Sequence, residues 1–141
     1  MPGGESAADH LKKVGHYSPG EATRIMTQAC AGLSAAHKEG LIHRDMKPAN
    51  LLFTSSGITK VSDFGVAKFM QGESMGLTQQ GQLVGTPCYM SPEQCEGKPV
   101  DARSDVYSLG ATYFSLLVGR MPYEEEKSFI NVMHAISMQS P

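Results

Sequence analysis

The residues best suited to chemistry lie in the segment 43–50 and at Asp63. The carboxylate of Asp45 can orient an incoming hydroxyl group and accept its proton. Lys47 can place a positive point charge beside a phosphate group. Asn50 and Asp63 offer the hard oxygen ligands that Mg²⁺ prefers when phosphates complete its coordination. These residue types indicate a site that brings together a phosphate, a divalent cation and a hydroxyl nucleophile.

A short hairpin is predicted between these two groups of residues. The runs Leu51–Phe53 and Ile58–Val61 are rich in β-prone side chains, and residues 54–57 (TSSG) between them are typical of a turn. Phe64–Met70 is predicted to add a further short strand. The two groups of candidate residues therefore lie on either side of the hairpin.

Two helices are predicted before the hairpin. Ser6 can cap a short helix that runs to about Val14. The second helix is predicted over Pro19–Glu39, because residues 18–21 (SPGE) combine an N-cap serine, a proline at the first helical position and a glutamate at the third. Gly40 follows as the glycine that commonly ends a helix.

After the hairpin, the sequence predicts a long loop and then three helices. Gln71–Gln82 is polar and glycine-rich, without periodicity, and is predicted to be the loop. Ser91–Glu93 can open a short helix, Ser104–Val118 is apolar on most sides and is predicted to be buried, and Glu124–Met138 has one apolar face. The predicted fold class is mainly α with small β-hairpins.

Longer motifs run through the candidate residues. The segment 43–50 (HRDMKPAN) matches H-R-D-x-x-x-x-N, and residues 63–65 are D-F-G. Residues 85–87 (GTP), residues 91–93 (SPE) and Asp105 follow in order. In these motifs the chain resembles the C-terminal lobe of a eukaryotic-like (Hanks-type) serine/threonine protein kinase. The run 100–110 (VDARSDVYSLG) is most similar to bacterial members of that family.

The resemblance extends over essentially all of residues 1–141, with residues 63–93 as the activation segment. It implies a protein-kinase-like fold and transfer of the γ-phosphate of ATP to Ser or Thr hydroxyls of protein substrates, with ATP and Mg²⁺ as cofactors. Phosphoryl transfer has a loose, highly charged transition state, so its catalysis depends mostly on positioning and charge neutralisation. The residue types in the two motifs are suited to that task.

The same resemblance assigns roles around the phosphate. Asp45 would be the proton acceptor, and Lys47 would lie beside the γ-phosphate. Asn50 and Asp63 would hold Mg²⁺. The nucleotide site would consist of these two residues with Lys47 and with Leu52, which would form the floor beneath adenine.

Other roles implied by the resemblance are structural. His43 and Phe64 would stack in an internal apolar spine. Asp105 would form hydrogen bonds with the backbone around His43 and Arg44, and so support the catalytic loop. Gly65 would let the backbone turn directly after the metal ligand.

The activation segment would supply the residues that select the substrate and regulate the site. Thr86 would bond to Asp45 and Lys47 and shape the site for a Ser or Thr hydroxyl. Thr78 is expected to be the activating phosphorylation site. Arg44 beside Asp45 is the pattern of kinases in which a phosphate on this loop pairs with an arginine and orders the loop.

Several family features do not occur within residues 1–141. There is no glycine-rich G-x-G-x-x-G-x-V loop, no lysine strand and no helix with its glutamate partner, so this fragment is expected to lack the N-terminal lobe. The last helices of the C-terminal lobe are expected to be absent too, which would leave Glu93 without its usual arginine partner. Ser91 replaces the usual alanine of A-P-E, a change expected to be mild. Apolar surfaces near Leu52, Phe64 and the helix Ser104–Val118 would then be open, which predicts self-association.

Composition excludes other classes of function. With 40% hydrophobic and 18% charged residues among 141, the chain can build a core, and a net charge of −2 offers no basic field for nucleic acid. No stretch is apolar and long enough to cross a membrane. The three cysteines form no CxxC pair, and no signal segment precedes them, which favours a cytoplasmic location.

Three functional hypotheses remain open at this stage. The first is a fragment of an active serine/threonine protein kinase. The second is a non-catalytic kinase-like interaction module, which the absence of a lysine strand would suit. The third is a small-molecule kinase on the same fold, although Lys47, Thr86 and the S-P-E segment favour a protein substrate.

Overall fold

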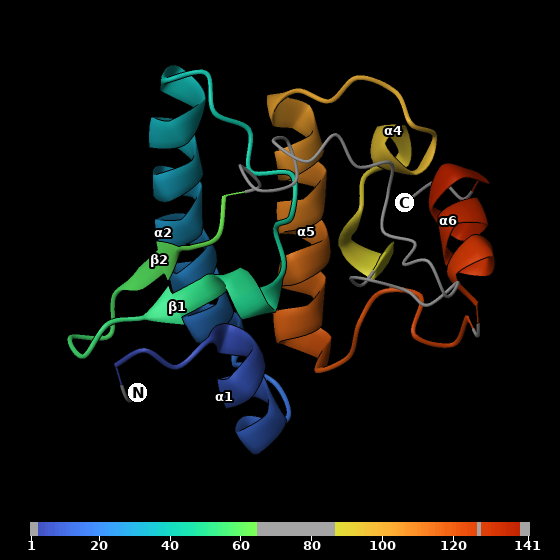
Figure 1. Ribbon diagram of the computed structural model, residues 1–141. Helices are drawn as coiled ribbons and strands as arrows, with labels where there is room; N and C mark the ends of the chain where they lie inside the picture. Colours follow the sequence, from blue (N-terminus) through green and yellow to red (C-terminus); the bar gives the residue numbers. More distant parts are fainter. Residues whose placement is uncertain (1–2, 65–86, 127, 139–141) are drawn as a thin grey trace.

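The computed structural model describes residues 3–64, 87–126 and 128–138. Within these ranges the protein is mostly helical, with one two-stranded sheet (Figure 1). The elements in chain order are α1 (Ala7–Val14), α2 (Pro19–Lys38), the 3-10 turn η1 (Pro48–Asn50), β1 (Leu51–Phe53), β2 (Thr59–Val61), the 3-10 turn η2 (Pro87–Tyr89), α4 (Pro92–Cys95), α5 (Ala102–Val118) and α6 (Phe129–Met138).

The first two helices begin and end close to where the sequence predicts. The Ser6 hydroxyl caps α1 by accepting a hydrogen bond from the backbone N–H of Asp9. At α2, Ser18 and Glu21 form a reciprocal capping box, which satisfies N–H groups that have no partner inside the helix. Gly40 follows α2 with a φ of 77°, a left-handed conformation that glycine adopts without steric cost.

The predicted hairpin is present as the antiparallel pair β1–β2, in which Leu51 lies opposite Val61 and Phe53 opposite Thr59. Its second strand begins at Thr59, one residue later than expected. Ile58 belongs to the turn because its backbone N–H donates to the Thr54 hydroxyl rather than to the facing strand.

The main core lies between α2, α5 and the hairpin, and α2 and α5 run side by side (Figure 1). Apolar side chains of α2, including Ile25 and Leu33, pack in one cluster with Phe53 of β1 and Leu116 of α5. The buried face of α5 is unexpectedly polar. Its buried residues include Ser104, Asp105, Ser108, Thr112 and Ser115.

A second, smaller cluster joins η2, α4 and α6 and includes Cys88, Cys95 and Ile136. The hydroxyls of Tyr89 and Ser115 lie 3.0 Å apart and connect this cluster to α5. Burial raises the pKa of the Cys95 thiol to about 11, so this thiol is protonated at neutral pH and poorly nucleophilic. All three cysteines are free.

Two of the predicted helix boundaries are wrong. Helix α5 begins at Ala102 rather than Ser104, because the Asp101 carboxylate caps it by accepting from the N–H of Arg103. Helix α6 begins at Phe129 rather than Glu124. The Ser128 hydroxyl accepts from the N–H of Asn131 at that start.

Helix α5 also departs from the expectation of burial on most sides. Val106, Phe114 and Val118, spaced by eight and then four residues, lie on one side of the helix and are 63%, 38% and 48% exposed. They form one apolar stripe along the helix. No helix in the described part of the chain is both long and apolar enough to cross a membrane. The predicted strand Phe64–Met70 lies almost wholly outside the described residues, and the loop Gln71–Gln82 lies entirely outside them.

Gly119, which ends α5, is predicted to tolerate no side chain. Its φ is 80°, and a Cβ atom there would lie 2.0 Å from the carbonyl oxygen of Gly15. We expect Gly119→Ala to lower the free energy of unfolding by more than about 2 kcal/mol, since the left-handed conformation alone costs about 1–2 kcal/mol and the clash adds to it. Urea unfolding followed by circular dichroism measures this change.

Gly40→Ala is the matched control for that experiment. Gly40 also follows a helix and has a φ of 77°, but a Cβ atom there would meet nothing within 4 Å. We expect it to show only the backbone cost, about 1 kcal/mol. Equal effects of the two substitutions would contradict the close approach of Gly119 to Gly15.

Candidate active site

The H-R-D segment is held by a carboxylate from α5. Asp105 is only 1% exposed. Its two oxygens accept hydrogen bonds from the backbone N–H of His43 at 2.8 Å and from that of Arg44 at 2.9 Å. The ring nitrogen Nε2 of His37, on α2, lies 2.7 Å from the same carboxylate. Three donors thus converge on one buried carboxylate. Their hydrogen bonds offset the free-energy cost of burying its negative charge.

This support matters because the loop carries backbone strain. Arg44 has a φ of 73° and Asp63 a φ of 54°, values in the left-handed region that cost a residue other than glycine about 1–2 kcal/mol. Such conformations persist where surrounding contacts over-determine them. At Arg44, the hydrogen bond to Asp105 is one of those contacts.

His43 connects the loop to the end of the hairpin. Its side chain is fully buried, and its Nδ1 accepts the backbone N–H of Asp45 at 3.1 Å. Its Nε2 lies 2.7 Å from the carbonyl oxygen of Ser62, so Nε2 must carry the proton and donate it. The imidazole ring also contacts the ring of Phe64, with centroids 4.7 Å apart and planes inclined at 55°, so the two predicted neighbours are in contact but tilted rather than stacked.

The catalytic candidates themselves lie close together. The ammonium nitrogen of Lys47 is 3.5 Å from Oδ2 of Asp45, and both side chains are partly exposed. The amide nitrogen of Asn50 donates to the carbonyl oxygen of Asp45 at 2.7 Å. Met46, between these residues, is 1% exposed and anchors the loop in the core.

The hairpin brings Asn50 and Asp63 to the same end. Residue 50 directly precedes β1 and residue 63 closely follows β2, and the N–H of Ser62 donates to the carbonyl oxygen of Asn50 at 2.9 Å. Because the Asn50 amide nitrogen is committed to Asp45, its amide oxygen is the atom left to face a cation.

The donor set fits Mg²⁺. An amide oxygen and a carboxylate are hard ligands, and Mg²⁺ is usually held by few protein oxygens together with substrate phosphates and water. Among the described residues, no group of three or more His, Cys, Asp and Glu side chains could hold a metal ion by itself. Asn50 and Asp63 would therefore hold the ion only with help from phosphates.

Of the remaining predicted site residues, some lie within the part of the chain that the structure describes and others lie outside it. Leu52 is half-buried in β1, and its backbone pairs with Ser6. Gly65, Thr78 and Thr86 lie outside the described residues, so the roles expected for them stay predictions.

Comparison with known proteins agrees with these motifs. The model of the protein kinase domain matches residues 1–140. The chain belongs to the protein kinase family. It is 44% identical to the serine/threonine-protein kinase PknA of Corynebacterium glutamicum over 138 residues, which cover 98% of this chain and 29% of that protein. It is also 41% identical to the serine/threonine-protein kinase PknB of Mycolicibacterium smegmatis over 120 residues, 85% of this chain and 19% of that protein.

A third relative is a probable serine/threonine-protein kinase of Corynebacterium efficiens, 44% identical over 126 residues, 89% of this chain and 19% of the relative. The chain therefore spans about a fifth to under a third of the length of these kinases.

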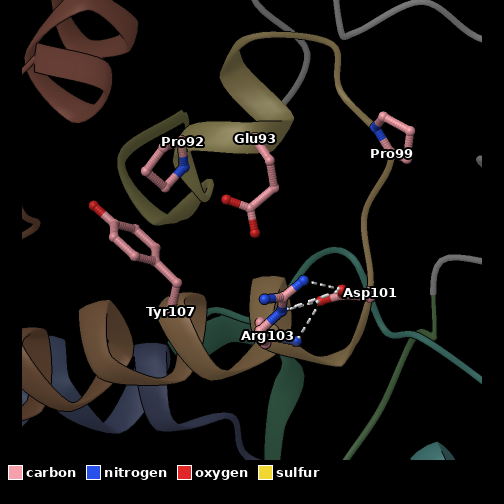
Figure 2. A pocket seen from close by; sticks show the side chains of 6 residues that line it. All are labelled: Pro92, Glu93, Pro99, Asp101, Arg103 and Tyr107. Atoms are coloured by element: carbon pink, nitrogen blue, oxygen red, sulfur yellow. Dashed lines mark hydrogen bonds and ion pairs between the residues drawn. The ribbon is translucent and has the colours of Figure 1, made fainter.

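The glutamate of the S-P-E motif has a hydroxyl partner. Glu93 is predicted to lack the arginine that usually pairs with it, and in the structure the hydroxyl of Ser104 donates a hydrogen bond to its carboxylate. Figure 2 shows this carboxylate directed into a pocket whose other lining residues are Pro92, Pro99, Asp101, Arg103 and Tyr107. The Ser104 hydroxyl holds the pKa of Glu93 below its usual value. The contact thus contributes stability at neutral pH that is lost as the pH falls through that lowered pKa.

Two residues of this kinase site were missed by the sequence analysis. His37 contacts Asp105 from α2, and no local pattern points to it. Gln94 of α4 donates from its side-chain nitrogen to the carbonyl oxygen of Arg44 at 2.8 Å. The sequence signal for Gln94 was the spacing S-x-x-Q of a capping box, which predicts the cap but not the contact with Arg44.

Proposed function

We propose that residues 1–141 form the catalytic-loop part of a serine/threonine protein kinase and correspond to its C-terminal lobe. The observation that carries the proposal is the convergence of Asp45, Lys47 and Asn50 at one end of the hairpin, next to Asp63. Three similar proteins are named serine/threonine-protein kinases, which supports the choice of Ser and Thr as acceptors.

In this function Asp45 orients the acceptor hydroxyl and takes its proton as the oxygen bonds to the γ-phosphorus of ATP, while the bond from that phosphorus to the β–γ bridging oxygen breaks and ADP leaves. Lys47, 3.5 Å from Asp45, provides positive charge where the transferred group and the acceptor meet. Asn50 and Asp63 hold Mg²⁺, which supplies charge neutralisation on the phosphates. Leu52, which is only half-buried in β1, forms part of the surface under adenine.

The substrate would be a protein, with Thr86 shaping the site for the hydroxyl and residues 63–93 acting as the activation segment. We place the protein in the cytoplasm, where ATP is available and free thiols such as those of Cys88 and Cys95 persist. The apolar stripe of α5 is a candidate surface for self-association when it is not covered.

A chimera tests the proposed function. Residues 1–141 would replace the matched segment of PknA of Corynebacterium glutamicum, which aligns with 98% of this chain. We expect the chimera to transfer ³²P from γ-labelled ATP to Ser and Thr residues, as measured by phosphoamino acid analysis. A folded chimera that transfers no phosphate would favour the non-catalytic interaction module instead.

We predict that Asp63→Asn makes the chimera depend on much higher Mg²⁺. The amide keeps one oxygen ligand but lacks the negative charge of the carboxylate, which weakens metal binding, and we expect activity at fixed Mg²⁺ to fall by at least about 10-fold. Titration with Mg²⁺ at saturating ATP measures the shift. An unchanged Mg²⁺ dependence would remove Asp63 from the metal site.

A second prediction concerns regulation. We expect the active chimera to phosphorylate itself at Thr78, because this threonine lies in the polar part of the activation segment, eight residues before Thr86. Tandem mass spectrometry after incubation with ATP and Mg²⁺ locates the phosphate. Phosphate found only at other positions would exclude Thr78 as the activating site.

A further inference from the structure

We propose that Gln94 is a positioning residue that couples helix α4 to the catalytic loop. Its side-chain amide bridges two backbone groups that are far apart in the sequence: the N–H of Ser91, which begins α4, and the carbonyl of Arg44, which precedes Asp45. The inference rests on the proposed function, because it concerns how the catalytic aspartate is held.

The two ends of the Gln94 amide have different partners. Its oxygen accepts from the backbone N–H of Ser91 at 3.0 Å, and its nitrogen donates to the carbonyl oxygen of Arg44 at 2.8 Å. A backbone N–H can only donate and a carbonyl can only accept. Only one orientation of the amide satisfies both contacts, so the assignment of its nitrogen and oxygen follows from the network.

The contact with Arg44 acts on the peptide bond that carries Asp45. The carbonyl of this peptide receives the Gln94 hydrogen bond, and its N–H, which belongs to Asp45, donates to Nδ1 of His43 at 3.1 Å. The peptide plane is therefore held on both sides by side chains. This peptide bond directly follows the φ torsion of Arg44, whose value of 73° is strained. Rotation of the peptide plane would turn Asp45 away from an acceptor hydroxyl.

A comparison of two capping boxes in the described residues explains why residue 94 is a glutamine rather than a glutamate. At α2 the same cap is made by Ser18 and Glu21, so a carboxylate is sufficient for capping. At α4 the corresponding residue is Gln94. A carboxylate there would still accept from Ser91, but it would place a second negative oxygen against the Arg44 carbonyl. The cap alone does not require glutamine, whereas the contact with the loop does.

The functional consequence is a connection between α4, which begins at the end of the activation segment, and the loop that holds Asp45. A misplacement of about 1 Å at a reacting group can cost about 100-fold in rate. Gln94 should therefore influence turnover more than ATP binding, although it touches neither the nucleotide nor the substrate.

Gln94→Glu in the PknA chimera tests the proposal. We expect kcat to fall by roughly 10- to 100-fold while the KM for ATP changes by less than about twofold. Hydrogen exchange measured by mass spectrometry should become faster in the peptide covering residues 43–50 and stay unchanged in α2. This second readout does not depend on activity.

Gln28→Glu is the matched control, since it makes the same chemical change elsewhere. The Gln28 side-chain oxygen accepts from the N–H of Thr59 at 2.7 Å, and a carboxylate can take over that role. We expect it to change neither kcat nor exchange in residues 43–50. Ser91→Ala removes the serine of the cap but keeps the Gln94 nitrogen, and we expect kcat to stay within about threefold.

The outcomes separate the possible explanations. A Gln94→Glu protein with unchanged kcat and unchanged exchange overturns the proposal, and so does a Ser91→Ala protein that loses as much activity as Gln94→Glu. If the folded parent chimera transferred no phosphate, the proposed function would fail, while faster exchange of residues 43–50 in Gln94→Glu would still show that Gln94 positions the loop.

Discussion

Asp45→Asn in the PknA chimera is expected to lower kcat by about 100- to 10,000-fold, the range typical for loss of a general base. The substitution keeps the shape of the side chain but removes both the negative charge and the proton acceptor. The carbonyl contact from Asn50 is to the backbone of residue 45, so it should survive and hold the loop. A steady-state kinase assay with a protein substrate measures the loss.

Asp9→Asn provides the comparison for that variant. Asp9 lies on α1 with its side chain 59% exposed, and this carboxylate contacts Ser6 and Lys12. We expect its kcat to stay within about twofold of the parent chimera. If Asp45→Asn retained more than about a tenth of the activity, Asp45 would not be the proton acceptor.

Asp105→Ala is expected to have the largest effect on the stability of the loop. The carboxylate accepts from the backbone of His43 and Arg44 and from the His37 ring. A buried donor left without a partner costs about 1–3 kcal/mol, so we expect the free energy of unfolding to fall by about 3–5 kcal/mol. Urea unfolding of the chimera measures this change.

His37→Ala distinguishes the side-chain contact to Asp105 from the two backbone contacts. It removes only one of the three donors to Asp105 and leaves both backbone contacts in place, so we expect a loss of about 1–2 kcal/mol. A loss as large as that of Asp105→Ala would show that the His37 contact, rather than the backbone contacts, stabilises the loop.

Sequence reasoning was most successful where a signal depends on residues close together in the chain. The caps at Ser6 and Ser18, the glycine after α2 and the hairpin around residues 54–57 all have local causes, and all are present. The start of α6 was missed for a local reason too. The glutamates at residues 124–126 favour a helix, but α6 begins only at Phe129, after the cap at Ser128.

The amphipathic pattern was less informative for α5. The segment Ser104–Val118 is apolar on most sides, which predicted a buried helix, but its serines and threonines line the buried face while Val106 and Val118 are exposed. Periodicity identifies the helix, and it does not say which face meets which neighbour, because that depends on where α2, η2 and the catalytic loop pack.

The sequence by itself determined the catalytic residue types, their order and the hairpin that separates them, since phosphoryl transfer needs those groups at short, fixed spacings. The resemblance predicts that Asp105 supports the catalytic loop, but only the tertiary structure shows which atoms make the contacts and that Gln94 adds another. Asp105 and Gln94 reach the backbone of Arg44 from 61 and 50 residues away. Contacts over such separations leave no local pattern, because they depend on how α4 and α5 pack around the loop rather than on neighbours in the chain.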